Sequence, residues 1–115
     1  MPNIQKFGGT LITRVLDVSD EMKNRRDYRD VLMTLVEEVG ELSTEIAIDS
    51  GHKNREPGVD GIIGEALDVI IAAVDIIHLA YKHTEYTNAS IESLLMSRAG
   101  PKLEKWELSV QKGEK

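Results

Sequence analysis

The sequence predicts an all-α protein, a bundle of four helices that is completed by oligomerisation. Isoleucine, valine, leucine and alanine are plentiful, whereas aromatic residues make up only 4% of the 115 residues. Apolar residues recur at three- and four-residue steps, and the strict alternation that is typical of strands is scarce. One segment of about twenty residues is apolar nearly all round, and such a helix must be surrounded by protein on every side.

The first helix is expected over residues 10–23, although Ser19 and Asp20 are placed where they can interrupt it. Asp27 is suited to cap a second helix, and Ser50 with Gly51 is suited to end it. The apolar face of this second helix consists of Leu32, Leu35, Val36, Val39, Leu42 and Ile46.

Residues 51–61 form a loop by their glycine, proline and asparagine content. Asp60 is a candidate cap for a third helix over residues 62–82. Ser90 can begin a fourth helix, which Gly100-Pro101 interrupts or restarts, so the expected number is four helices, or five if one breaks.

The whole chain, 1–115, is expected to be a single helical domain with its core at about 10–110 and a frayed tail at 111–115. The first twenty residues lack the pattern of a secretory signal and the chain has no cysteine, so a cytoplasmic location is expected. The net charge of −6 argues against nucleic-acid binding through phosphate neutralisation. Any anionic ligand must therefore arrive with cations.

Three acids interrupt the apolar third helix: Glu65, Asp68 and Asp75. Each would cost roughly 2.5 to 3.5 kcal/mol in a bilayer, which argues against a membrane helix. At about 100° per residue the three acids share one narrow stripe, and the segment holds no lysine or arginine. Such acids can pair with Arg25, Arg26 or Arg29, lie at a wet edge, or bind a cation.

The second helix carries its own acidic face, made of Glu37, Glu38, Glu41 and Glu45. A solvated helix face would account for it, but such faces usually mix glutamate with lysine, and residues 30–51 contain no lysine or arginine. If the second and third helices pack antiparallel, the two acidic stripes converge. Carboxylate-rich pockets of this kind suit Mg²⁺ or Mn²⁺.

Glu37-Glu38-x-x-Glu41 followed by Glu65-x-x-Asp68 resembles the EExxE…ExxD pattern of the MazG-like all-α nucleoside triphosphate pyrophosphohydrolases. The surrounding segments LVEEVGEL and EALDVIIAAVDI are similar to sequences of that family. The segment KLEKW near the C-terminus resembles short members, including phage ones. The resemblance covers residues 28–77 well and the remainder weakly.

The resemblance implies Mg²⁺-dependent hydrolysis of ribo- or deoxynucleoside triphosphates to a monophosphate and pyrophosphate, with a role such as nucleotide-pool cleansing, by a homodimer or homotetramer. It makes Glu38, Glu41, Glu65 and Asp68 the metal ligands. Glu37 becomes a further ligand or the group that orients and deprotonates the attacking water, so the catalytic set is Glu37, Glu38 and Glu41. Mn²⁺ is an alternative ion.

Several residues keep two interpretations. Lys53 and Arg55 can bind phosphates or be ordinary loop residues. Asp75 can support the metal ligands or a buried polar contact, and its DxxH spacing to His78 occurs only once, unlike the paired motifs of di-iron bundles. Tyr81 and Trp106 can stack on a base but are more often core or interface residues.

Two other functions remain open. One is a neighbouring chemistry, either a dUTPase or a phosphoribosyl-ATP pyrophosphohydrolase, because sequence motifs do not separate these activities. The other is a helical oligomerisation or adaptor module without catalysis. Base and sugar preference have no local sequence pattern.

Overall fold

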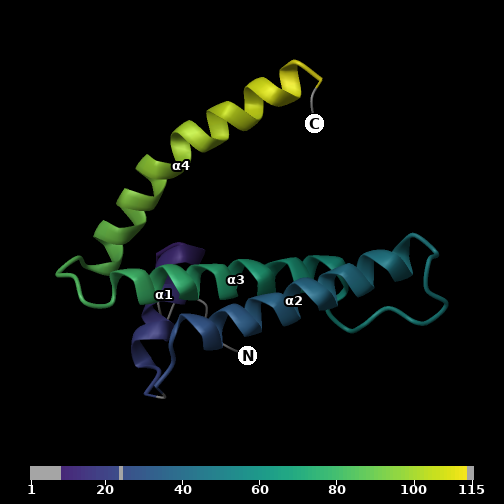
Figure 1. The fold of residues 1–115 in the computed structure, drawn as a ribbon, viewed down its shortest axis with the longest axis horizontal. Coiled ribbons are helices and arrows are strands. Elements are labelled where there is room, and N and C mark those ends of the chain that lie inside the picture. Colours follow the sequence, from purple (N-terminus) through teal and green to yellow (C-terminus); the bar gives the residue numbers. More distant parts are fainter. Residues whose placement is uncertain (1–8, 24, 114–115) are drawn as a thin grey trace. The chain divides into compact units, whose positions relative to one another are not determined.

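The computed structural model describes residues 9–23 and 25–113, and these contain four α-helices and no strand (Figure 1). The helices are α1 (Leu11–Glu21), α2 (Tyr28–Asp49), α3 (Gly61–Tyr81) and α4 (Asn88–Gln111). The prediction of an all-α fold with four helices is confirmed. Within the described ranges, no helix combines the length and apolarity that crossing a bilayer requires.

The contacts divide the chain into two compact units, one ending at His83 and the other beginning at Thr84. In the first unit, α3 packs against both α2 and α1. α2 and α3 run side by side in opposite directions, as Figure 1 shows. This is the antiparallel pairing that the short loop between them favours.

Reciprocal capping boxes begin α1 and α2. At α2, the Asp30 backbone N–H donates to Asp27 Oδ1 and the Asp27 N–H donates to Asp30 Oδ2, each at 3.0 Å. The predicted cap at Asp27 is therefore confirmed. Ser19 and Asp20 do not interrupt α1, which continues through both to Glu21.

α2 ends in a Schellman motif. The His52 N–H donates to the Ala47 carbonyl at 2.8 Å and the Gly51 N–H donates to the Ile48 carbonyl at 3.1 Å. Gly51 has a φ of 78°, which a residue without a Cβ adopts at little cost. The capping interaction expected at Asp60 is absent, because that residue has helical backbone angles and its side chain accepts no capping hydrogen bond.

α4 forms the second unit and is one continuous helix. Thr87 caps it, accepting a hydrogen bond from the Ser90 N–H at 3.1 Å, so the helix begins slightly before the predicted start at Ser90. The alternative of a break at Pro101 is wrong. A proline inside a helix lacks the N–H of one helical hydrogen bond, but α4 continues through Pro101 to Gln111.

The expected frayed tail falls partly within α4, which ends at Gln111 with Lys112 as its C-cap. Residues 114 and 115 lie outside the described part of the chain. So do residues 1–8, which carry much of the expectation about a secretory signal.

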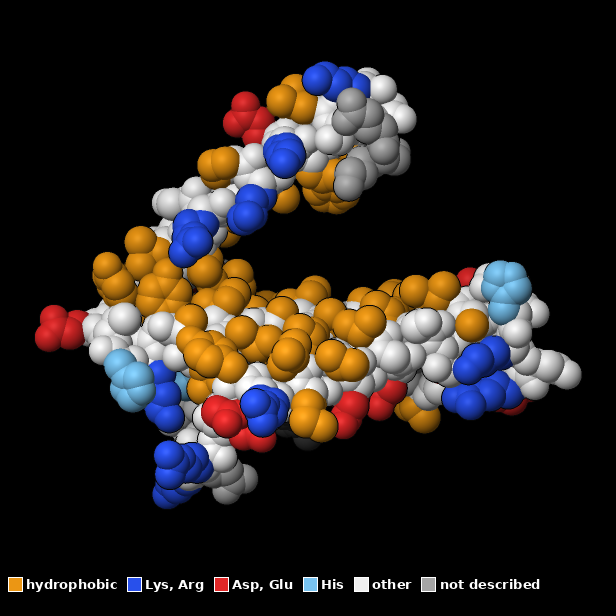
Figure 2. Space-filling model, in the orientation of Figure 1, with side chains coloured by type: hydrophobic (Ala, Val, Ile, Leu, Met, Phe, Trp, Pro, Cys, Tyr) orange, Lys and Arg blue, Asp and Glu red, His pale blue; other side chains and the backbone are white. Residues whose placement is uncertain are grey.

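The first unit has a small core and much exposed apolar surface. Its buried apolar side chains are Val15, Leu16, Val31, Ala72 and Val74. Figure 2 shows hydrophobic side chains running along α2 and α3 on the face in view. Among the large apolar side chains of α3, Ile63 is the most exposed, at 78% of its maximum. The sequence predicts that α3 is surrounded by protein, but within this unit part of its apolar surface stays exposed to solvent.

Leu16 tests how the unit is held together, because it is the largest fully buried side chain among the described residues. We expect Leu16→Ala to lower the free energy of unfolding by about 2 to 5 kcal/mol, through lost burial and the cavity left behind. Urea unfolding followed by circular dichroism measures the loss. The control Val59→Ala removes a fully exposed side chain and should change the value by about 0.5 kcal/mol or less. Equal effects of the two variants would contradict the assignment of this core.

Candidate metal centre

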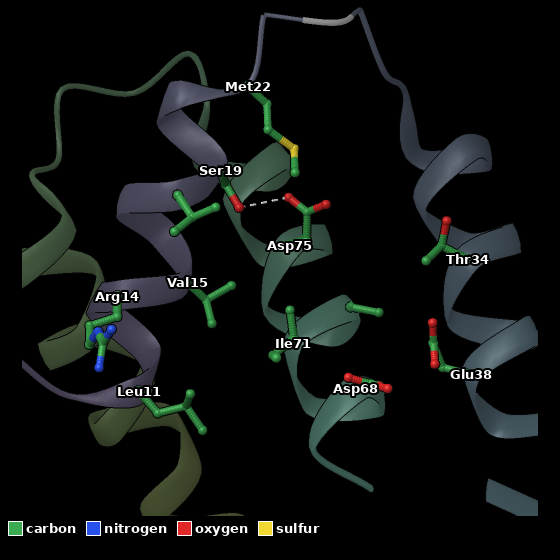
Figure 3. Close-up of a pocket in the computed structure, with 12 residues that line it drawn as sticks. Leu11, Arg14, Val15, Ser19, Met22, Thr34, Glu38, Asp68, Ile71 and Asp75 are labelled. Carbon is green, nitrogen blue, oxygen red and sulfur yellow. Dashed lines mark hydrogen bonds between the residues drawn. The ribbon is translucent and has the colours of Figure 1, made fainter. Parts of the chain in front are cut away.

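Three carboxylates meet where α2 and α3 lie side by side: Glu38 from α2, and Glu65 and Asp68 from α3. One oxygen from each lies within 4.8 Å of the others. Glu65 and Asp68 are three residues apart and so share a face of α3. In Figure 3 Asp68 and Glu38 approach each other from neighbouring helices. The acidic faces of α2 and α3 therefore meet, as predicted, at Glu38, Glu65 and Asp68.

The environment of these carboxylates suits a cation. Oε2 of Glu38 and Oε2 of Glu65 are both shielded from solvent and have no hydrogen-bond partner. A buried carboxylate oxygen without a partner is costly, and three negative groups at this separation repel one another. A hard divalent ion such as Mg²⁺ or Mn²⁺, which prefers oxygen ligands, would relieve both penalties.

The pKa values of Glu65 and Glu38 are consistent with this repulsion and burial. Burial, hydrogen bonding to Glu41 and the charges of the neighbouring acids raise the pKa of Glu65 to about 7. Burial and the charges of Glu41 and Asp68 also raise the pKa of Glu38. Each shift reflects a charged form that is disfavoured without a counter-ion.

The other two predicted glutamates lie at the edge of this centre. Glu41 is exposed but interacts with both Glu38 and Glu65, so it adjoins the three carboxylates without joining the tight group. Glu37 is also exposed and acts on Glu38 through its charge. The structure therefore brings Glu38, Glu65 and Asp68 together and leaves Glu37 outside.

Glu45 has a different role from the acids that precede it on α2. It is buried, and its Oε1 accepts a hydrogen bond from the Gly58 backbone N–H at 2.9 Å. This contact folds the returning half of the 51–60 loop against α2. Glu45 is therefore a loop anchor, not a member of the carboxylate group.

Lys53 and Arg55 are exposed in that loop. The loop follows Asp49, eleven residues beyond Glu38, which is about 16 Å along the axis of α2. The structure does not bring either side chain into the carboxylate group. Their role in binding phosphate stays a prediction.

Asp75 lies on the same face of α3 but has protein partners. Ser19 Oγ donates to its Oδ1 at 2.8 Å, and Arg26 Nη1 forms a salt bridge with its Oδ2. Of the alternatives that the sequence left open, pairing with Arg26 is the correct one for this acid. One turn further, His78 Nε2 is hydrogen-bonded to Asp20 Oδ1 at 2.7 Å.

A pocket of about 510 Å³ adjoins the carboxylates, with α1 and α2 as its walls and α3 between them (Figure 3). It is lined by Leu11, Arg14, Val15, Val18, Ser19, Met22, Thr34, Glu38, Asp68, Ile71, Ala72 and Asp75. The sequence pattern does not predict this pocket. Its α1 wall is an ordinary apolar helix face, and the only available signal was a Ser-Asp pair in a helix interior, where polar residues need partners.

Compared with known proteins, the chain matches no family model, no curated protein and no solved structure. The resemblance to the MazG-like proteins therefore rests on the sequence pattern, and the geometry above stands independently of it.

The raised pKa of Glu65 predicts how stability depends on pH without divalent ions. Between its ordinary value of 4.5 and about 7, the folded protein holds a proton that the unfolded chain releases. Stability from this group is therefore present at pH 4.5 and is lost as the pH rises through 7. Thermal melts in chelator from about pH 5 to 8 should show a Tm that falls as the pH rises.

The variant Glu65→Gln isolates this effect, because the amide does not titrate. Its Tm should depend less on pH than that of the wild type, and added Mg²⁺ should raise the wild-type Tm most at pH 8. Glu56→Gln, in the exposed loop, serves as the control and should keep the wild-type slope. The same slope in wild type and Glu65→Gln would remove Glu65 as the source.

Proposed function

We propose that this chain is a Mg²⁺-dependent nucleoside triphosphate pyrophosphohydrolase of the MazG-like kind. The observation that carries the proposal is the meeting of Glu38, Glu65 and Asp68, with unpartnered buried oxygens, at the positions that match the EExxE…ExxD pattern. An acidic protein needs such a centre to bind a polyphosphate, because the ion supplies the positive charge that the chain lacks. A cytoplasmic role in cleansing the nucleotide pool is part of this proposal.

In this proposal each acidic residue has a role that follows from its position in the site. Glu38, Glu65 and Asp68 hold the ion, and Glu41 beside them completes its ligands. When bound, Mg²⁺ neutralises phosphate charge and lowers the pKa of water. Glu37 is exposed and next to the centre, so it orients the attacking water and accepts its proton. The water oxygen bonds to the α-phosphorus, the bond from that phosphorus to the bridging oxygen breaks, and pyrophosphate leaves.

Product analysis tests this reaction directly. The protein is mixed with a panel of ribo- and deoxynucleoside triphosphates, with Mg²⁺ and with excess chelator, and the phosphorus products are identified. We expect monophosphate and pyrophosphate with metal only. Orthophosphate with diphosphate would move the bond that is cleaved, and no product from any nucleotide would favour the adaptor function.

Replacing single ligands tests the residues. Asp68→Asn and Glu41→Gln should each lower kcat/KM by about 100-fold or more, because each removes a charge that holds the ion. Helix content by circular dichroism should stay unchanged. Glu21→Gln, on the exposed end of α1, is the matched control and should retain full activity. Full activity of both ligand variants would overturn the site.

We further propose that a second copy of the chain covers the exposed apolar stripe of the first unit, giving a homodimer or a homotetramer built from it. On α2 the stripe consists of Leu32, Val36, Val39 and Ile46, and on α3 of Ile63, Leu67 and Ile70. These residues are spaced by three, four or seven positions, as residues of helix seams are. Apolar patches of this extent are unusual on monomers.

Light scattering tests this association. The wild type should have two or four times the mass of one chain. Val36→Asp places a charge where 61% of a valine side chain is now exposed in the single chain, and should shift the mass to that of one chain. Val59→Asp, in the loop, is the control and should leave the mass unchanged. A monomeric wild type would contradict the proposal.

A further inference from the structure

The pocket beside α1 is continuous with the candidate metal centre. Glu38 and Asp68 belong to both, so a ligand whose phosphates approach the centre has this pocket beside them. The walls between the two ends are mostly apolar, supplied by Val15, Val18 and Ile71 among others. The volume of about 510 Å³ lies within the range typical of small-molecule sites.

Asp75 and Ser19 line the other end of the pocket. Asp75 is seven residues beyond Asp68 on the same face of α3, about 10.5 Å along the axis. This matches the span from the phosphate next to the sugar to the far edge of the base in an extended nucleotide. The pocket therefore offers a phosphate end and a base end at a suitable separation.

The chemistry of Asp75 favours a particular kind of base. Its side chain is only 15% exposed, and Arg26 and Ser19 each bind one of its oxygens. A carboxylate has about four acceptor positions, so two remain. In such surroundings it accepts hydrogen bonds from an amino group, as acidic side chains do from cytosine. Uracil and thymine present a carbonyl oxygen at the same position, which the carboxylate repels.

We propose that this pocket holds the nucleoside part of the substrate. We further propose that Asp75 selects a base with an amino group where uracil and thymine carry a carbonyl, namely cytosine or adenine. The inference rests on the proposed function, which places the phosphates at Glu38, Glu65 and Asp68. Arg26 and Ser19 are positioning residues, since each fixes one oxygen of Asp75.

Binding without turnover tests this selection. Titration calorimetry with Mg²⁺ compares three probes: the α,β-methylene analogue of dCTP, the same analogue of dUTP, and inorganic tripolyphosphate. The cytosine analogue should bind about tenfold more tightly than the uracil analogue, since a mispaired base costs this much or more. Tripolyphosphate, which has no nucleoside to place in the pocket, should bind more weakly than either. Asp75→Asn should reduce or invert the preference, because its amide N–H₂ donates to the uracil carbonyl.

His78→Gln is the matched control. The Asp20–His78 hydrogen bond joins α1 to α3 just as the contact of Ser19 with Asp75 does, but His78 does not line the pocket. Loosening of α1 alone should therefore weaken both nucleotide analogues equally and leave their ratio unchanged. A ratio changed as much by His78→Gln as by Asp75→Asn would assign the effect to α1 and overturn the role of Asp75.

A pocket-filling variant gives a second test, even if Asp75→Asn does not fold. Val18 lines the pocket and is 41% exposed, so Val18→Trp narrows it from the rim. It should weaken both nucleotide analogues about tenfold or more and leave tripolyphosphate unchanged. Nucleotides and tripolyphosphate that bind the wild type equally would overturn the nucleoside pocket and spare the metal centre. Failure of all three probes to bind with Mg²⁺ would overturn the proposed function as well.

Discussion

The main constraint on the first unit is an unfavourable contact, in which carboxylates of two antiparallel helices lie close together. Glu38 faces Glu65 and Asp68, and part of each glutamate is shielded from water. Repulsion and desolvation both oppose this contact, so the apolar sides of α2 and α3 must offset the cost. The raised pKa values of Glu38 and Glu65 are the direct result. A helix pair that carries such a penalty is stabilised by any cation that binds its folded form and not its unfolded chain.

α1 adds the feature that the acidic pair lacks, a wall that creates a pocket. Two polar contacts near its end hold it to α3: Ser19 with Asp75, and Asp20 with His78. The Leu11 end of α1 contributes apolar lining to the pocket, and Leu16 is fully buried. Polar contacts with defined geometry fix the orientation of a helix more narrowly than apolar packing does. The width of the pocket therefore depends on residues that lie outside the acidic pattern.

The sequence predicts the helices and the carboxylate group because both follow from local spacing. Glu65 and Asp68 share a face by helical period, and antiparallel pairing across a short loop brings Glu38 to them. The contacts of α1 do not follow from spacing, since Ser19 and Asp75 are 56 residues apart. The prediction at Pro101 shows the opposite limit of local rules. A proline is expected to interrupt a helix, but α4 continues through it.

Asp68 and Asp75 show how one helical stripe can serve two purposes. Both acids lie on the same face of α3, and periodicity alone treats them alike. Arg26 gives Asp75 a fixed cation from the protein, whereas Asp68 faces further acids. The pocket therefore has one end whose charge is already balanced and one end that requires a mobile cation. A nucleotide has the same polarity, with a neutral base and an anionic phosphate chain that carries divalent ions. The proposed orientation of the substrate thus follows from the pairing of Asp75 with Arg26. The base lies at Asp75, and the phosphates lie at Asp68, which has no such arginine partner among the described residues.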